Sequence, residues 1–164
     1  MRNKGFSLLE LIVVLVIISF SIALVAPSLS RISKTVELKG ATKKISAILR
    51  YYRSEAVNRG KVYQIFFDSN LKEVKVQSVE SIEEKGEEET KKEKAPQKIY
   101  SLPEGVQIKE IKVDSPQYPS DLPTIEFYPN GGSNGGTVFL DSKDLKGYKI
   151  KVHFLTGVVQ IEQA

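Results

Sequence analysis

Apolar residues follow one period in the first third of this chain and another in the rest. From Leu11 to Ala26 sixteen apolar or small residues run without a break. Beyond them large apolar residues recur mostly every three or four positions, at Leu29, Ile32, Val36, Ala41, Ile45, Ile48, Leu49, Tyr52 and Ala56. These steps predict a nearly continuous helix from Phe6 to about Asn58, with one apolar stripe along its second half. Such a helix is ~80 Å long at 1.5 Å per residue, so we expect its second half to pack on the domain that follows.

One proline and one glycine mark expected bends, and a second glycine marks the end of the helix. Pro27 lacks a backbone donor, and Gly40 has the weakest helix preference apart from proline, so both are expected bend points. Asn58-Arg59-Gly60 ends the helix, because glycine adopts the left-handed conformation of a C-terminal cap without strain.

After Gly60 the apolar residues alternate with period two, which is typical of strands. Val62 to Phe67 and Leu71 to Val79 flank Asp68-Ser69-Asn70 and predict a hairpin. Shorter alternating segments follow at 106–113, 125–127, 138–140 and 150–154, and the last two strands are expected to turn at Thr156-Gly157. Six to eight short strands without a second long helix predict an α+β fold, a long N-terminal helix packed on an antiparallel sheet.

Two stretches have no strand or helix pattern. Residues 80–94 hold seven acids, four bases and one large apolar residue, which cannot bury enough surface to offset their ordering entropy. We therefore expect a mobile acidic loop over 80–97, with docking to a basic partner as the functional alternative. Residues 114–123 contain Pro116, Pro119 and Pro123, which exclude regular structure.

The charges are unevenly distributed along the chain. Residues 31–61 hold nine Lys or Arg against two acids, whereas residues 62–164 hold thirteen against seventeen. A basic stem and an acidic head favour charge complementarity between subunits, or with lipid headgroups, over a nucleic-acid groove. Arg2 and Lys4 precede the apolar run with no acid beside them, which predicts a cytoplasmic N-terminus and a head on the outer side of a membrane. Because the chain has no cysteine, a disulfide framework and a thiolate metal site are excluded.

Glu10 is a single carboxylate between the basic leader and the apolar run. A carboxylate costs up to ~3 kcal/mol near mid-bilayer, so it is expected to have a partner or a task there. An ordinary single-span anchor explains the apolar run but gives no reason for Glu10. A cleaved secretory signal needs small residues at its end, where this chain has Leu24 and Pro27.

No residue pattern supports catalysis, a cofactor or a metal site. His153 is the only histidine and is predicted to lie in a strand, without a Ser or Cys motif around it. Asn130 to Gly136 lacks the Lys-Ser/Thr of a phosphate loop, which favours a flexible hairpin turn. Asp141 and Asp144 are too few for a calcium loop and are interpreted as turn residues.

Gly5-Phe6-Ser7-Leu8-Leu9-Glu10 resembles the leader end of type IV prepilins, with Gly before Phe and Glu four residues after it. The resemblance implies cleavage between Gly5 and Phe6 by a prepilin peptidase and N-methylation of the new Phe6 amine. It also implies that Glu10 pairs with the Phe6 amine of a neighbouring subunit during assembly. Pro27 lies where this class commonly has a helix-bending proline.

Three later blocks are similar to the GspH/FimT family, which groups the minor pseudopilin H of type II secretion with related minor pilins. The first is Ile45 to Ala56, with Arg53-Ser54-Glu55-Ala56 near its end. The second comprises residues 125–132 and 135–140, and the third comprises residues 150–152 and 156–159. Val158 stands where members of the family often have Arg after the Thr-Gly turn. This departure and the C-terminus without a basic cluster weaken the case for DNA binding.

The resemblance implies a minor pseudopilin of the type II secretion system, with a minor type IV pilin in pilus assembly or DNA uptake as the alternative. The implied partners are other major and minor pseudopilins, an inner-membrane assembly platform and secreted cargo, with nucleic acid not expected. The implied domains are a leader (1–5), a transmembrane and filament-core segment (6–27), an amphipathic stem (28–60) and a periplasmic β-rich head (61–164).

Overall fold

The computed structural model describes residues 7–79, 98–113, 120–143 and 145–164, and gives only the helical backbone over 23–30. The predicted leader, the acidic loop over 80–97 and residues 114–119 of the proline-rich stretch lie outside these ranges. The chain divides into an N-terminal unit, Met1–Val36, and a C-terminal unit, Glu37–Ala164.

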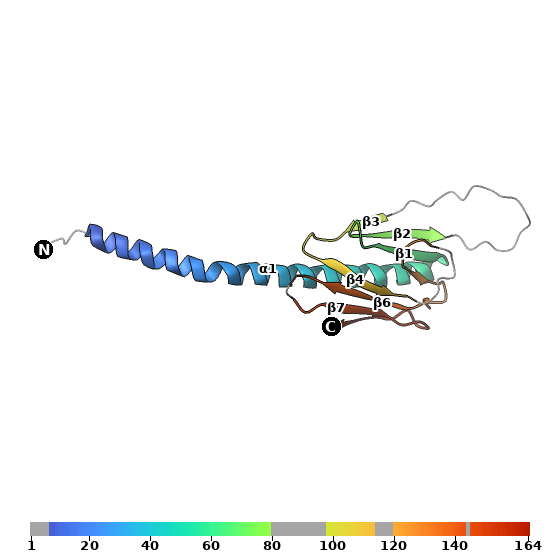
Figure 1. Cartoon of the computed structure of the whole chain (residues 1–164). Coiled ribbons are helices and arrows are strands. Elements are labelled where there is room, and N and C mark those ends of the chain that lie inside the picture. Colours follow the sequence, from blue (N-terminus) through green and yellow to red (C-terminus); the bar gives the residue numbers. More distant parts are fainter. Residues whose placement is uncertain (1–6, 80–97, 114–119, 144) are drawn as a thin grey trace, which may run out of the picture. The chain divides into compact units, whose positions relative to one another are not determined.

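One long helix, α1 (Leu8–Arg59), contributes to both units (Figure 1). Its ends match the sequence prediction closely. Gly60 follows the last helical residue with φ +63°, so the left-handed glycine cap is confirmed. The predicted bends at Pro27 and Gly40 stay predictions.

The apolar stripe of α1 is buried only from Leu38 onward, which corrects the longer stripe expected from the sequence. Ile32 and Val36 are 58% and 65% exposed. The buried helix residues share one face and are Leu38, Ala41, Ile45, Ile48, Leu49, Tyr52 and Ala56. Residues of this face pack on the strands, as the length of the helix predicted.

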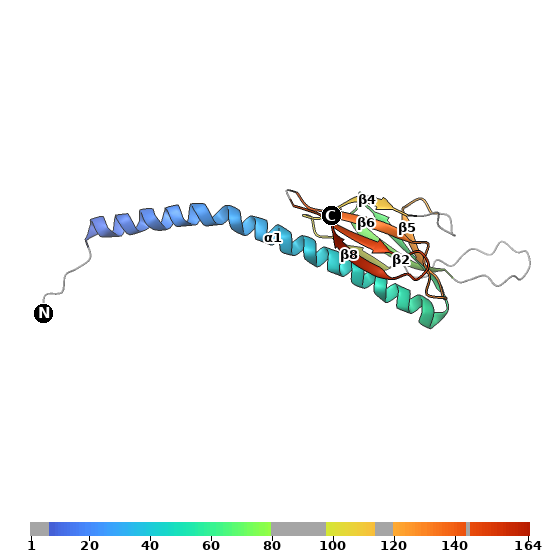
Figure 2. The same cartoon turned by 90° about the horizontal axis from the view of Figure 1, so that it is seen from below.

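Eight strands form two four-stranded sheets in the C-terminal unit. The first has the order β3-β2-β1-β5 and contains β1 (Val62–Asp68), β2 (Glu73–Val79), β3 (Lys98–Ser101) and β5 (Thr124–Phe127). The second has the order β4-β6-β7-β8 and contains β4 (Gln107–Lys112), β6 (Gly136–Asp141), β7 (Tyr148–Val152) and β8 (Val159–Gln163). Figure 2 labels β4, β6 and β8 of this sheet. Every pairing is antiparallel, so the predicted α+β fold is confirmed.

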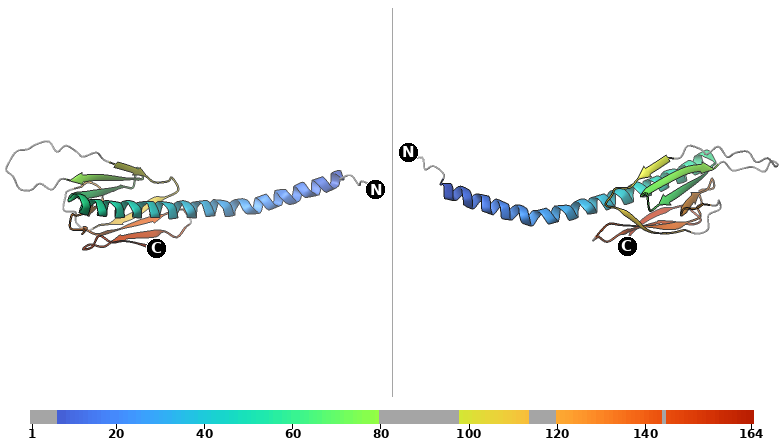
Figure 3. Two further views of the ribbon diagram at one scale, coloured as in Figure 1. Left: turned by 180° about the vertical axis from the view of Figure 1, so that it is seen from behind. Right: turned by 45° about the horizontal axis from the view of Figure 1, so that its top comes forward.

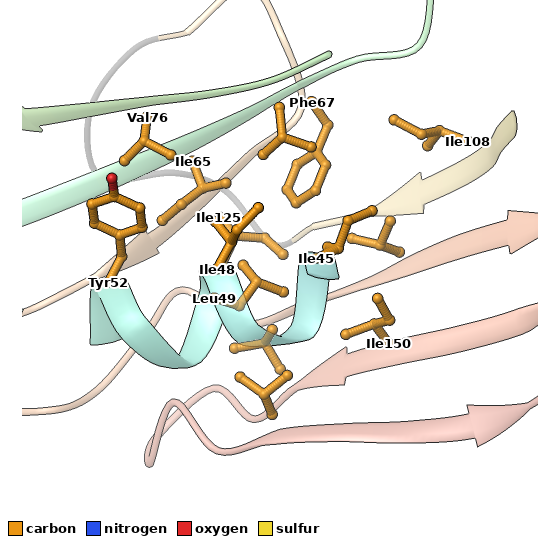
Figure 4. Close-up of a cluster of buried hydrophobic side chains, with 14 of the residues drawn as sticks. Ile45, Ile48, Leu49, Tyr52, Ile65, Phe67, Val76, Ile108, Ile125 and Ile150 are labelled. Carbon is orange, nitrogen blue, oxygen red and sulfur yellow. The ribbon is translucent and has the colours of Figure 1, made fainter. Parts of the chain in front are cut away.

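The core lies between the C-terminal half of α1 and both sheets (Figure 3). Ile45, Leu49 and Tyr52 of the helix point toward Ile65 and Ile125 of the first sheet (Figure 4). The second sheet adds Ile108 and Ile150 to the same cluster. Fully burying such a side chain contributes about 1.5–3 kcal/mol, so this cluster holds the helix and the two sheets together.

A tyrosine pair extends the core toward β3, a strand that the sequence pattern missed. The hydroxyls of Tyr52 and Tyr100 lie 3.1 Å apart and share a hydrogen bond. Burial, and then the bond to Tyr100, raises the pKa of Tyr52 above its ordinary value. Because β3 pairs with β2 and its Tyr100 contacts the helix, this short strand joins two parts of the fold.

The hairpin predicted around Asp68-Ser69-Asn70 is confirmed by the pairing of β1 with β2. The Asp68 carboxylate accepts hydrogen bonds from the backbone N–H groups of Asn70 and Leu71, at 3.1 and 3.0 Å, and from Lys75 Nζ at 3.2 Å. Asp68 therefore caps the turn that sets the register of the two strands.

Asn130 to Gly136 begins as the predicted hairpin turn, because Ser133 forms an antiparallel bridge with Phe127 and the Tyr128 N–H donates to the Gly132 carbonyl at 3.0 Å. The segment then continues from β5 in one sheet to β6 in the other, and its residues 131–135 are buried. Two local predictions are wrong. His153 lies one residue beyond β7 and, with Phe154, enters the following turn. Asp141 is the last residue of β6 and not part of a turn. Asp144 lies outside the described residues.

Candidate functional site

The first turn of α1 is fixed by Ser7, a residue that the sequence analysis did not single out. The backbone N–H groups of Glu10 and Leu11 donate to the Ser7 carbonyl at 3.0 and 3.1 Å, and Leu9 N–H donates to Ser7 Oγ at 3.3 Å. Ser7 is thus the N-cap of α1. Ser-x-x-Glu is the sequence signature of such a start, and it could have been found from the sequence alone.

Glu10 occupies the third position of the helix and is exposed in the isolated chain. Its carboxylate has no ion pair or hydrogen bond with any other residue in the described part of the chain. The positive end of the helix dipole favours a carboxylate at this place. Gly5 and Phe6, the predicted cleavage and methylation site, lie outside the described residues, so the predicted pairing of Glu10 with a Phe6 amine stays a prediction.

The first part of α1 exposes large apolar side chains around the whole helix. Leu8, Leu9 and Phe20 are each more than 70% exposed, and the residues Leu11, Ile12, Val13, Val14, Leu15, Val16, Ile17, Ile18 and Ile22 are exposed as well. An apolar surface on every side requires an apolar environment or partner helices. This surface is the candidate functional site of the N-terminal unit.

Two serines within this segment do not interrupt its apolar character. Ser19 Oγ donates to the Leu15 carbonyl at 2.8 Å, and Ser21 Oγ donates to the Ile17 carbonyl at 2.9 Å. Their donors are satisfied by the backbone of the same helix, so neither needs water or an external partner.

In the part of the chain that the structure describes, no helix combines the length and the apolar character that a membrane span needs.

At the other end of α1 an arginine joins two loops of the C-terminal unit. Arg53 Nε donates to the carbonyls of Thr156 and Gly131, at 2.8 and 3.3 Å. One turn of helix earlier, Arg50 donates to the Val159 carbonyl at 3.1 Å. Two basic residues that looked like part of a charged stem are thus used inside the fold, where they hold the C-terminal strands on the helix.

The crossover between the two sheets is fixed by a buried polar network. Glu126 is fully buried and accepts hydrogen bonds from Gln64 Nε2 at 3.0 Å and from the Tyr128 hydroxyl at 2.9 Å. The Asn134 side chain accepts from Glu126 N–H at 2.8 Å and donates to the Thr124 carbonyl at 3.0 Å. These bonds give the 130–136 segment one conformation, and no sequence periodicity reveals them.

Titratable groups do not gather into a reactive cluster in this region. Over residues 7–79, 98–113, 120–143 and 145–164, no three His, Cys, Asp or Glu residues stand close enough to hold a metal ion. His153 is exposed at the start of its turn and donates its backbone N–H to the Val158 carbonyl at 3.0 Å.

Both ends of the chain are similar to known protein families. The family model of the prokaryotic N-terminal methylation motif matches residues 1–26, and the model of type II transport protein GspH matches residues 41–156. The type II secretion system protein H of Xanthomonas campestris pv. campestris is 26% identical over 158 residues, which cover 96% of this chain and 82% of that protein.

Two solved structures share the fold. The minor pseudopilin EpsH from the type 2 secretion system of Vibrio cholerae matches with a TM-score of 0.56 and 15% identity, over 77% of this chain and 97% of that one. The type IV minor pilin FimU of Pseudomonas aeruginosa matches with a TM-score of 0.54 and 18% identity, over 80% and 92%. Both comparisons describe the fold alone.

Proposed function

The chain belongs to the GspH family of type II transport proteins, and on that premise we propose that it is a minor pseudopilin of a type II secretion system. The apolar surface of the N-terminal unit carries this proposal. Because its large side chains are exposed around the helix from Leu8 to Ile22, the segment must be buried by lipid or by other helices. A filament built from packed N-terminal helices supplies such burial, and the protein acts by assembly without a catalytic step.

In this proposal each segment of the chain has its own role. Residues 1–5 are the leader, residues 6–27 anchor the protein and later pack in the filament core, residues 28–60 form the stem, and residues 61–164 form the head. Before assembly the N-terminal segment lies in the inner membrane as a single pass, with the N-terminus in the cytoplasm and the head in the periplasm. Arg2 and Lys4 support this orientation. A bend at Pro27 would let the anchor and the stem take different directions.

Processing precedes assembly in this proposal. A prepilin peptidase cuts between Gly5 and Phe6, and the Phe6 amine is methylated, as the match to the N-terminal methylation motif supports. The carboxylate of Glu10 then pairs with the Phe6 amine of a neighbouring subunit. Its exposure, and its lack of a partner in the described part of the chain, leave it available for this contact.

The partners of the assembled protein are other major and minor pseudopilins and the inner-membrane assembly platform. The secreted cargo is a further partner of the head. The exposed apolar segment contacts the other pseudopilins. The strands of the C-terminal unit provide the surface for the assembly platform and the cargo.

The processing step is tested by intact-mass spectrometry of the full chain after expression with a prepilin peptidase. We expect a mature chain that begins at Phe6 and is one methyl group heavier than the unmodified sequence. A Gly5→Leu variant should keep its leader. A wild-type chain that keeps Met1 to Gly5, or that begins near Pro27, would contradict the proposal.

The alternative is a minor type IV pilin that binds DNA, and the basic residues of α1 favour it. Three of them, Lys44, Arg50 and Arg53, donate to backbone carbonyls of the C-terminal unit. Lys39 and Lys43 are further exposed cations on this part of the helix. A titration of duplex DNA near physiological salt separates the two functions. For a pseudopilin we expect affinity no better than ~10⁻⁴ M, whereas sub-micromolar binding weakened by Lys39→Ala with Lys43→Ala would establish the alternative.

A further inference from the structure

The outer face of the second sheet gathers three lysines around two central residues. In the strand register Thr137 of β6 lies between Lys112 of β4 and Lys151 of β7. Two positions along β6, Phe139 has Lys149 of β7 beside it. The intervening residues Val138 and Leu140 are buried, so Thr137 and Phe139 share the opposite face of the sheet.

The lysine side chains converge on this face. The Nζ atoms of Lys112 and Lys149 each lie 5.5 Å from the centre of the Phe139 ring. With neighbouring strands ~4.8 Å apart, Lys112 and Lys151 are separated by about 10 Å across Thr137. Cations held this close on one face repel each other, and an anion between them would offset the repulsion.

A cavity of about 380 Å³ opens beside Thr137. Its lining includes Lys112, Lys151, His153, Val113 and Phe154, and it contains no acid from the described residues. Phe154 is 56% exposed at this place. The cavity is therefore lined by two lysines and a threonine, residues that can bind a carboxylate, and by apolar residues that can contact the aliphatic part of the same ligand.

Two glutamates on the same face favour a peptide carboxylate over a nucleic-acid phosphate backbone as the bound anion. Glu110 lies 3.2 Å from Lys112 Nζ, and Glu162 lies 3.9 Å from Lys149 Nζ. A continuous phosphate backbone would run past both carboxylates and be repelled, whereas an acidic peptide that also contains neutral residues can place its carboxylates beside the lysines and its neutral side chains toward the glutamates. Lys151 has no ion pair with any residue in the described part of the chain, so its charge is available.

We propose that this lysine pocket, formed by Lys112, Thr137, Lys151 and Phe154, docks a glutamate- or aspartate-rich segment of a neighbouring protein subunit. The inference deepens the proposed function and rests on it, because it assigns a head contact within the assembly. It adds a specific contact to the filament packing of the N-terminal helices.

The test uses the full-length chain in a non-ionic detergent and a fluorescein-labelled, capped hexapeptide, Glu-Glu-Val-Glu-Glu-Val. We expect saturable binding by fluorescence anisotropy that weakens as salt is raised, and no binding of the peptide with Gln in place of every Glu. The variant Lys112→Gln with Lys151→Gln should weaken binding by about 5- to 30-fold, from two exposed charge pairs. The matched variant Lys143→Gln with Lys146→Gln removes the same charge elsewhere on the surface and should change binding less than about twofold.

Equal losses in the two lysine variants, or equal binding of the Gln peptide, would overturn the proposal. Tighter binding of a DNA duplex to the same lysines would overturn it as well. Peptide binding that appears only after residues 80–97 are replaced by a Gly/Ser linker would make the chain's own acidic stretch the occupant and so reject a neighbouring subunit. Because these measurements do not involve the leader or Glu10, their failure leaves the processing test of the proposed function unaffected.

Discussion

Arg53 donates its Nε–H to the carbonyl of Thr156, 103 positions further along the chain, at 2.8 Å. The same Nε–H also reaches the Gly131 carbonyl at 3.3 Å. One side chain near the end of α1 therefore ties the crossover between the sheets to the turn between β7 and β8. Arg53 belongs to a block that resembles the family, and the structure gives that block a physical role.

Arg53→Ala should destabilise the C-terminal unit by about 1–2 kcal/mol, because two backbone carbonyls lose a charged donor at a partly exposed site. In thermal unfolding of the full chain this corresponds to a fall in Tm of about 3–6 °C. The Tm of Arg53→Lys should lie between those of wild type and Arg53→Ala, because a lysine amine supplies the charge without the planar Nε–H. Lys43→Ala, an exposed change on the same helix, should leave the Tm nearly unchanged, and an equal fall there would remove the special role of Arg53.

Two glycine-to-alanine changes should have opposite signs. Gly157 has φ +60°, and a Cβ there would lie 2.7 Å from the Gly131 carbonyl oxygen. Gly157→Ala should therefore cost about 1–3 kcal/mol through strain and a displaced carbonyl. Gly40 lies inside α1, and a Cβ added there would meet nothing within 4 Å, so Gly40→Ala should stabilise by about 0.5–1 kcal/mol. Chemical denaturation measures the free energy of unfolding of each variant against wild type, and equal m-values make these free energies comparable. A Gly157→Ala variant more stable than wild type would contradict the described turn.

The sequence predicted those parts of the fold that depend on local periodicity and turn chemistry. Helix α1, its glycine cap, the β1–β2 hairpin and the turn at Thr156-Gly157 all follow from such signals. The partition of the strands into two sheets was not predicted, because it depends on long-range packing. The turn after Pro129 could be predicted from its glycines, but the buried hydrogen bonds of Asn134 and Glu126 beside it have no signal in the sequence.

The candidate site was predicted to a different extent at the two ends of the chain. The apolar segment and Glu10 could be predicted from composition and a short motif, and both are exposed, while the assembly role of Glu10 stays a prediction. The lysine pocket could not, because Lys112 and Lys151 meet only through the register of β4, β6 and β7. Alternation shows that both residues lie on polar faces of strands, but it does not show which strands are neighbours.

The buried pair of Gln64 and Glu126 should show strong coupling. Glu126→Leu leaves the Gln64 amide and the Tyr128 hydroxyl without this acceptor and should cost about 2–4 kcal/mol. Gln64→Leu should cost less, because it removes a single donor. In a double-mutant cycle the two changes together should cost less than their sum by about 1–3 kcal/mol. Tyr128→Phe, closer to the surface, should cost about 1 kcal/mol, and additive effects of Gln64→Leu and Glu126→Leu would argue against the network.

Asp68 should make the stability depend on pH. The Leu71 N–H, with smaller contributions from Lys75 and the Asn70 N–H, holds the pKa of the Asp68 carboxyl below its ordinary value, although burial opposes this shift. A lowered folded-state pKa adds stability above the unfolded-state value of ~3.9, and that stability is lost as the pH falls through the lower folded-state value. Asp68→Asn should therefore lower the Tm at pH 7, and its difference from wild type should shrink between about pH 5 and pH 2. A difference between Asp68→Asn and wild type that stays constant over this pH range would contradict the prediction.

Glu10→Val should separate membrane retention from assembly. It removes a charged group from an otherwise apolar surface, so the variant should remain in the membrane fraction at least as well as wild type. It also removes the partner proposed for the Phe6 amine of the next subunit, so co-purification with partner pseudopilins and secretion of cargo should fall by tenfold or more, which is about 1.4 kcal/mol of binding free energy.

Glu10→Asp keeps the charge on a shorter side chain and should recover part of the assembly. Ser7→Ala removes the N-cap without touching the carboxylate, and it should weaken the first helical turn by ~1 kcal/mol but leave assembly largely intact. Normal secretion and co-purification by Glu10→Val would show that Glu10 has no pairing role, whereas an equal defect in Ser7→Ala would trace the effect to the start of the helix.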